Sequence, residues 1–337
     1  MDAFEKRSFT VTRGYTYSYY ISPSTHKTDP NAPTLFFCHG WPDDARYWQF
    51  VAPKLLSLKF RILIPDLLGV GESSKPKHIA AYNFSYLTKD FVDIFDHEDI
   101  TKVIAIGHDW GSGVASRVYL YAPERVVGLI LLNVAYSPPS EEPFDVDVMN
   151  EMTKKFVGYP LFTYWHFFTS EEGTRLMSEN PEKVWEICHG VDADMHGSWM
   201  KKMFTVEGAM RDVILDPHPV ELKGYAQNEE LKREFVDRVK RDGFGTWQNY
   251  YHAWKDNLQY EAEKVGVPKD LHKIDLPVLY IGCSGDTAAR PDSIAPAKSA
   301  RLLPDLEEVL IESGHWCAFE KPEDVAKAIK GFLERRF

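Results

Sequence analysis

The 337-residue sequence lacks the features of a secreted, membrane-spanning or metal-cluster protein. No apolar run is long enough to cross a bilayer, and residues 1–7 lack the apolar core of a signal peptide. The four cysteines are scattered and show no metal-ligand spacing; they are Cys38, Cys188, Cys283 and Cys317. We therefore expect reduced structural thiols in a cytoplasmic protein, and no metal.

Positive charge is also in short supply. The chain has 39 Lys and Arg against 50 Asp and Glu, a net charge of -11. Nucleic acids and anionic membranes do not favour an acidic surface, so we expect neither as a partner. The hydrophobic share of 44% is ordinary for a globular protein. The length allows one large domain with an insertion, or two domains.

Short apolar segments separated by helical patterns run through both ends of the chain. Residues 9–20 alternate around Gly14 and predict a hairpin. Buried strands are predicted at 33–38, 60–66, 102–106, 126–133, 277–282 and 307–311. From about 137 to 265 the strand pattern disappears, and aromatic, amphipathic helical segments replace it. These patterns predict an α/β fold with a mostly parallel, doubly wound sheet. Residues 1–137 and 266–337 would form this core, and 138–265 an inserted helical cap.

The most informative stretch is Gly107-His108-Asp109-Trp110-Gly111, which lies between a predicted strand and a predicted helix. A strand, a sharp turn flanked by glycines and a helix together form a nucleophile elbow. Hydrolases of this type usually carry Ser at the central position, where this chain has Asp109. A carboxylate favours attack at carbon, which gives an ester. The absence of Ser and Cys from the elbow excludes a serine esterase.

A carboxylate nucleophile needs a base, oriented by an acid, to release its ester. His315 follows the last predicted strand, and Asp286 follows the preceding one. The order nucleophile, acid, histidine is the one expected of an α/β-hydrolase. Because the carboxyl ends of parallel strands line one crevice, we expect the three side chains to meet there. Asp292 is a weaker candidate for the acid.

With these residues in place, the chain resembles an epoxide hydrolase of the α/β-hydrolase superfamily, the soluble type of fungi, plants and animals. His39-Gly40-Trp41-Pro42 resembles the His-Gly-X-Pro motif of that family, whose X–Pro peptide is typically cis. Residues 66–73 resemble its glycine-rich turn, and 314–322 resemble the stretch around its histidine. The resemblance implies an oxyanion hole formed by the backbone N–H groups of Trp41 and Trp110.

The resemblance also implies that two cap tyrosines hold the epoxide oxygen. Tyr251 matches the later aromatic of the Asn-Tyr-Tyr motif, and Tyr164 lies in the region of the first tyrosine. Tyr159 and Tyr250 are the neighbours that could replace them. Nearby aromatic residues are expected to contact the substrate: Trp110, Trp165, Trp316 and Tyr250. The implied reaction converts a small epoxide and water to a vicinal diol through an Asp109 ester, without a cofactor, in a monomer or homodimer.

Two other functions remain open at this point. A haloalkane dehalogenase uses the same aspartate ester, but such enzymes usually carry a polar residue at the position of Trp41, and the Asn-Tyr-Tyr motif would have no obvious role. A small-molecule receptor could keep the scaffold without catalysis, because fold alone does not settle function.

Overall fold

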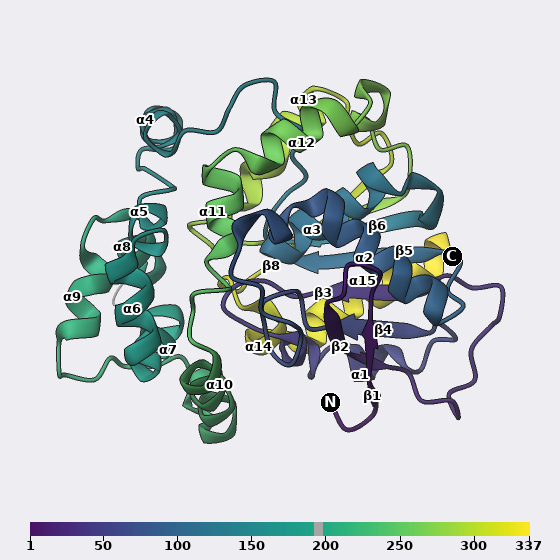
Figure 1. Ribbon diagram of the computed structural model, residues 1–337, viewed down its shortest axis with the longest axis horizontal. Helices are drawn as coiled ribbons and strands as arrows, with labels where there is room; N and C mark the ends of the chain where they lie inside the picture. The colour runs from purple at the N-terminus through teal and green to yellow at the C-terminus, as the bar shows by residue number, and fades with distance from the viewer. Residues whose placement is uncertain (192–197) are drawn as a thin grey trace. The chain divides into compact units, whose positions relative to one another are not determined.

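The computed structural model describes residues 1–191 and 198–337, which divide into two compact units (Figure 1). The core unit comprises Met1–Pro76, Ala80–Glu141 and Gln259–Phe337. The cap unit comprises Lys77–Ile79 and Glu142–Leu258. Among the described residues, no helix combines the length and the apolar character that a membrane span requires.

The core unit is built on one eight-stranded sheet in the order β1-β2-β4-β3-β5-β6-β7-β8. The strands are β1 (Glu5–Thr10), β2 (Thr16–Ile21), β3 (Thr34–Cys38), β4 (Ile62–Pro65), β5 (Val103–His108), β6 (Val126–Leu132), β7 (Val278–Cys283) and β8 (Leu306–Ile311). The β1–β2 hairpin and the β2–β4 pair are antiparallel, and every other neighbouring pair is parallel. The prediction of a mostly parallel sheet is confirmed. The central strands β3 and β5 are buried along their whole length, as expected of parallel strands whose two faces are covered by helices.

Helices α2 and α3 pack together on the sheet, and α1 packs against α15 (Figure 1). The helices of the core unit are α1 (Ala52–Leu55), α2 (Phe84–His97), α3 (Trp110–Tyr121), α13 (Ala295–Ser299), α14 (Cys317–Glu320), α15 (Pro322–Arg336) and nearly all of α12 (Leu258–Gly266). The Asn83 side chain caps the start of α2 by accepting from the Ser85 N–H.

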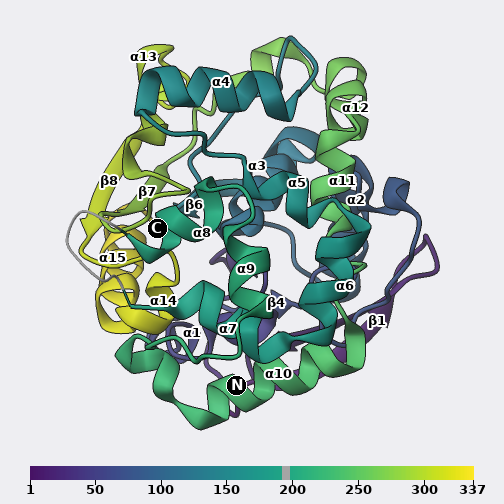
Figure 2. The same ribbon diagram turned by 90° about the vertical axis from the view of Figure 1, so that its left-hand side faces the viewer.

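The described part of the cap unit is helical, with one isolated bridge between Gly190 and Leu222 (Figure 2). Its helices are α4 (Val146–Val157), α5 (Tyr164–Phe168), α6 (Glu171–Glu179), α7 (Pro181–His189), α8 (Trp199–Thr205), α9 (Ala209–Leu215), α10 (Glu229–Asp242) and α11 (Asn249–Lys255). Side chains of Asp145, Ser170, Ser198 and Asn228 cap four of them.

The unit boundary near α12 differs from the expected cap limit at residue 265. Two buried polar side chains tie α12 to the core unit. Glu263 forms an ion pair with Arg117 of α3, 2.9 Å from Oε1 to Nε. Gln259 accepts from the Phe84 N–H and donates to the Tyr82 carbonyl. The sequence does not reveal these contacts, because each joins residues more than 140 positions apart. From the pattern alone, α12 is one more amphipathic helix.

Candidate active site

Strand β5 ends at the elbow, and Asp109 takes a backbone conformation that L-residues rarely adopt. Its φ is 54° and its ψ is -124°. Such strain persists only where the surroundings enforce it, and it is typical of functional sites. Helix α3 begins at the next residue. The carboxylate therefore stands at the carboxyl edge of the sheet, as the elbow motif predicts.

Three glycines make this turn possible because a side chain at any of them would clash. A Cβ at Gly40 would overlap the Asp109 side chain, and one at Gly111 would overlap the Cys38 carbonyl. A Cβ at Gly107 would overlap the Gly111 backbone. The close approach brings the loop after β3 directly against the nucleophile.

The two carboxylate oxygens of Asp109 have different surroundings. Oδ1 accepts a 2.8 Å hydrogen bond from the Trp41 N–H, just before a cis Trp41–Pro42 peptide. The Trp110 N–H also hydrogen-bonds the carboxylate. Oδ2 lies 3.7 Å from Nε2 of His315, which is longer than a hydrogen bond. Oδ1 is thus anchored by a backbone donor, and Oδ2 faces the histidine.

The structure brings His315 and Asp286 together on loops that follow β8 and β7. His315 Nδ1 lies 2.6 Å from Asp286 Oδ2. Asp286 Oδ1 accepts from the N–H groups of Ala288 and Ala289. The rival acid, Asp292, forms an ion pair with Arg290 instead. Asp286, and not Asp292, holds the imidazole, with Nε2 directed toward Asp109.

Asn133 is a contact residue of the site that the sequence did not single out. It directly follows β6 in the left-handed region, with φ 64°, and is fully buried. Its Nδ2 donates to Asp286 Oδ2 at 2.7 Å. Tyr280 donates a hydrogen bond to its backbone carbonyl at 2.9 Å. The available signal was a polar residue at the end of an apolar strand, at the same sheet edge as the triad.

His108 and Tyr47 hold the loop that carries His315. His108 Nε2 lies 2.9 Å from the His315 carbonyl oxygen. Tyr47, in the short 3-10 helix Ala45–Trp48, stacks on the His108 ring at 4.3 Å and accepts from the Ala318 N–H. Burial, and then the neighbouring charge of His315, lower the pKa of His108 well below its ordinary value. A neutral His108 therefore donates to the carbonyl.

Burial and charge act in opposite directions on the nucleophile and the base. Burial raises the pKa of Asp109, although the His315 charge and the Trp110 and Trp41 N–H groups oppose the shift. For His315, burial lowers the pKa, but the charge and hydrogen bond of Asp286 and then the charge of Asp109 outweigh it. The net result is a His315 pKa of about 9. At neutral pH the resting histidine is protonated.

The cap unit brings the two predicted tyrosines into one aromatic cluster. Tyr164 of α5 and Tyr251 of α11 lie with ring centroids 6.0 Å apart at 83°. Phe168 packs against both rings, at 5.0 Å and 5.1 Å. The alternatives lie elsewhere in the unit: Tyr250 packs on Trp247, and the Lys201 ammonium lies over Tyr159.

The remaining predicted contact residues have defined places. Trp165 packs against Tyr251 at 5.1 Å. Trp110 lies at the start of α3, 6.3 Å from Phe84. Trp316 is buried, and its Nε1 donates to Asp43 Oδ2 at 3.1 Å, which links the loop after β3 to the His315 loop. Substrate contact by these residues, and by Tyr250, stays a prediction.

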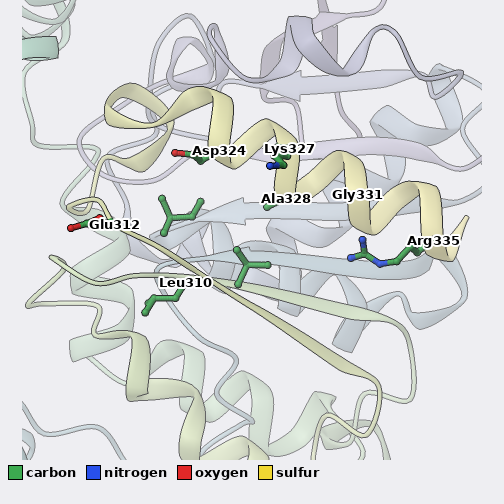
Figure 3. A pocket seen from close by; sticks show the side chains of 9 residues that line it. Leu310, Glu312, Asp324, Lys327, Ala328, Gly331 and Arg335 are labelled. Atoms are coloured by element: carbon green, nitrogen blue, oxygen red, sulfur yellow. The ribbon is translucent and has the colours of Figure 1, made fainter.

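The core unit has a depression on its surface (Figure 3). It lies between β8 and α15, where Leu310, Asp324, Lys327 and Arg335 are among the lining residues. No predicted site residue lines it. Within residues 1–191 and 198–337, no group of three His, Cys, Asp or Glu side chains is arranged to hold a metal ion.

The sequence is similar to known proteins over most of its length. A family model described as the alpha/beta hydrolase fold matches residues 33–188. Bifunctional epoxide hydrolase 2 of Mus musculus is 26% identical over 307 residues, which cover 90% of this chain. This chain spans about half of that relative, 52%. Epoxide hydrolase A of Mycobacterium tuberculosis is 27% identical over 327 residues, covering 90% of this chain and 91% of the relative.

Solved structures show the same fold. Epoxide hydrolase A from Mycobacterium thermoresistibile aligns with a TM-score of 0.78 at 23% identity, over 98% of both chains. The α/β-hydrolase fold predicted from the sequence is confirmed. The resemblance to epoxide hydrolases is confirmed as well, and the comparisons do not favour a haloalkane dehalogenase.

Proposed function

We propose that this chain, which has the α/β-hydrolase fold, is an epoxide hydrolase that forms a covalent ester on Asp109. One observation carries the proposal. Asp109 Oδ1 is bound by a backbone N–H, while Oδ2 faces Nε2 of a histidine that Asp286 orients. This arrangement leaves one carboxylate oxygen to attack carbon and prepares the other to carry charge later. The names of the relatives point to the same reaction.

Ring opening is the first step. Asp109 Oδ2 attacks a ring carbon, and the carbon–oxygen bond on the opposite side breaks. The departing oxygen takes a proton from a phenol, for which we propose Tyr164 or Tyr251, with the other phenol donating a hydrogen bond. A phenol has an ordinary pKa of about 10, so it is protonated at neutral pH and can serve as the acid.

Ester hydrolysis is the second step. His315 Nε2 takes a proton from water, and the resulting hydroxide attacks the Asp109 carboxyl carbon. Negative charge develops on Oδ1, which accepts from the Trp41 N–H, and the Trp110 N–H is the second proposed donor. The leaving diol oxygen takes the proton from His315. The carboxylic acid that forms at Asp109 then loses its proton, which restores the phenol.

The charge state of Asp109 links the two steps. In the resting protein its negative charge is one cause of the raised His315 pKa. Alkylation neutralises the carboxylate and removes that cause. The pKa of His315 must then fall, and the neutral imidazole needed as a base becomes more populated. The base is therefore activated by the ester that it has to hydrolyse.

A single turnover in heavy-oxygen water tests the proposal directly. The enzyme, in excess over styrene oxide, should yield unlabelled diol and one labelled oxygen in the Asp109 carboxylate. His315→Gln should instead accumulate an ester whose mass equals that of protein plus epoxide. Label in the first-turnover diol, with none in Asp109, would refute covalent catalysis. Halide release from a bromoalkane without diol formation would point to a dehalogenase, and neither product to a receptor.

A further inference from the structure

Helix α4 of the cap unit carries an apolar stripe that faces solvent. Val148, Met152 and Phe156 are 64%, 42% and 77% exposed. They are spaced by four residues, so successive members lie about 40° apart around the helix axis and form one ridge. Val265, by contrast, is 88% exposed and has no other strongly exposed apolar residue on its helix α12. Single exposed apolar side chains are ordinary, whereas a continuous stripe marks an interaction surface.

Helix α4 is capped at both ends and hydrogen-bonded to the chain that follows it, so the stripe lies on a well-defined helix. The Asp145 side chain caps the start of α4 by accepting from the Asp147 and Val148 N–H groups, and Gly158 ends the helix at φ 92°. Asn150 and Thr153 accept hydrogen bonds from the Phe162 and Leu161 N–H groups. In both views α4 lies away from α7, α9 and α10 (Figures 1 and 2).

The charged residues beside the stripe can pair with the same residues of a second copy of the chain. Glu151 and Lys155 are exposed and lie on the same side of the ridge. Neither takes part in an ion pair within residues 1–191 and 198–337, and the Lys155 ammonium lies beside the stripe, 5.7 Å from the centroid of the Phe156 ring. In an antiparallel helix pair related by a twofold axis, equal flanks meet, and Glu151 of each copy faces Lys155 of the partner subunit. The same axis, near Met152, puts Val148 against Phe156 of the partner subunit.

We propose that α4 is a homodimer contact, in which two copies of this chain pair antiparallel through Val148, Met152 and Phe156. The self-complementary flank selects a second copy over a partner of uniform charge or a membrane surface. A 12-residue helix is about 18 Å long. Its ridge buries less than the roughly 800 Å² per partner of a standard interface. The association is therefore weak and depends on concentration.

Sedimentation equilibrium across a concentration series tests the surface. The average mass should rise from the 38.7 kDa of one chain toward twice that value. Phe156→Asp should keep the protein monomeric, while the matched variant Val265→Asp should associate as the wild type does. A wild type that stays monomeric at several hundred micromolar overturns the proposal, whether or not it binds anionic vesicles. Unchanged association of Phe156→Asp overturns it as well.

Charge reversal tests the antiparallel register. Glu151→Lys and Lys155→Glu should each lose association, because like charges then face one another across the axis. An equimolar mixture of the two variants should regain it, since the two positive side chains on the flank of one variant meet the two negative ones of the other. Ion pairs within one helix cannot explain this recovery, because each variant carries two like charges at positions 151 and 155 of its own helix. Failure of the mixture to associate overturns the antiparallel pairing, and so does association of either single variant.

Discussion

The two groups of predicted site residues, one in each unit, are held by different physical means. In the core unit, hydrogen bonds fix much of the triad: Asp286 accepts from Asn133, Ala288 and Ala289, and its carboxylate holds the His315 ring. In the cap unit, the rings of Tyr164 and Tyr251 are positioned by packing against Phe168 and Trp165. Hydrogen bonds set protonation states, whereas ring packing sets only where a phenol can reach. We therefore expect the core to control ester chemistry and the cap to control ring opening.

The largest effect should follow from removing the nucleophile. Asp109→Asn should lower turnover by at least about 10⁴-fold, because an amide oxygen is a poor nucleophile and loss of a triad member has effects of this size. Steady-state diol formation measures the loss, and mass spectrometry of the protein should find no ester. The control is Asp292→Asn, which changes an exposed carboxylate that pairs with Arg290 in the wild type, and it should keep full activity. Ester formation by Asp109→Asn would contradict the assignment.

Removing both cap phenols should come next. The double variant Tyr164→Phe, Tyr251→Phe keeps the ring packing but loses both donors, so ring opening should slow by about 10² to 10⁴-fold. Stopped-flow measurement of ester formation in a single turnover reports this step alone. Tyr159→Phe and Tyr250→Phe are matched controls. Normal ring opening in the double variant, or a large loss in either control, would move the acid role to another tyrosine.

These two expectations differ in how well the sequence supports them. Asp109, His315 and Asp286 each follow a buried strand, and parallel strands bring their carboxyl ends to one edge, so pattern and topology suffice to unite them. Tyr164 and Tyr251 lie on separate helices, where 3.6-residue periodicity predicts a buried face but not which two rings meet. Their identification needed a family resemblance, and their shared packing needed coordinates.

The contacts that support the triad could not be predicted from the sequence, for another reason. Asn133 and Asp286 are separated by 153 positions, and His108 and His315 by 207. Nothing local in the chain says that these side chains pair. The end of the cap was equally hidden, because α12 has the same amphipathic pattern as cap helices and only Glu263 and Gln259 reveal that it belongs to the core unit.

A smaller effect should separate the positioning residues from the catalytic ones. Asn133→Gly tolerates the positive φ but removes the donor to Asp286, and His108→Phe keeps a ring against Tyr47 but removes the donor to the His315 carbonyl. Each loses one hydrogen bond near a charged pair, worth about 1.5–3 kcal/mol, so ester hydrolysis should slow roughly 10- to 100-fold. Ring opening should stay within about twofold, since these two hydrogen bonds go to the His315 carbonyl and to Asp286, not to the Asp109 carboxylate. Equal slowing of both steps would indicate general damage to the fold.

The smallest effect tests whether the nucleophile controls the base. The His315 pKa is about 9 in the resting protein, partly because of the Asp109 charge. Asp109→Asn removes that charge as alkylation does, so the His315 pKa should fall. A shift of one pH unit corresponds to about 1.4 kcal/mol. Titration of the imidazole by NMR measures the shift, with Asp292→Asn as the control.

In the wild type, ester hydrolysis should increase with pH and level off at an apparent pKa below 9, because only neutral His315 takes a proton from water. An unchanged titration in Asp109→Asn would mean that Asp286 alone sets the charge of the histidine, and the two steps would then be independent.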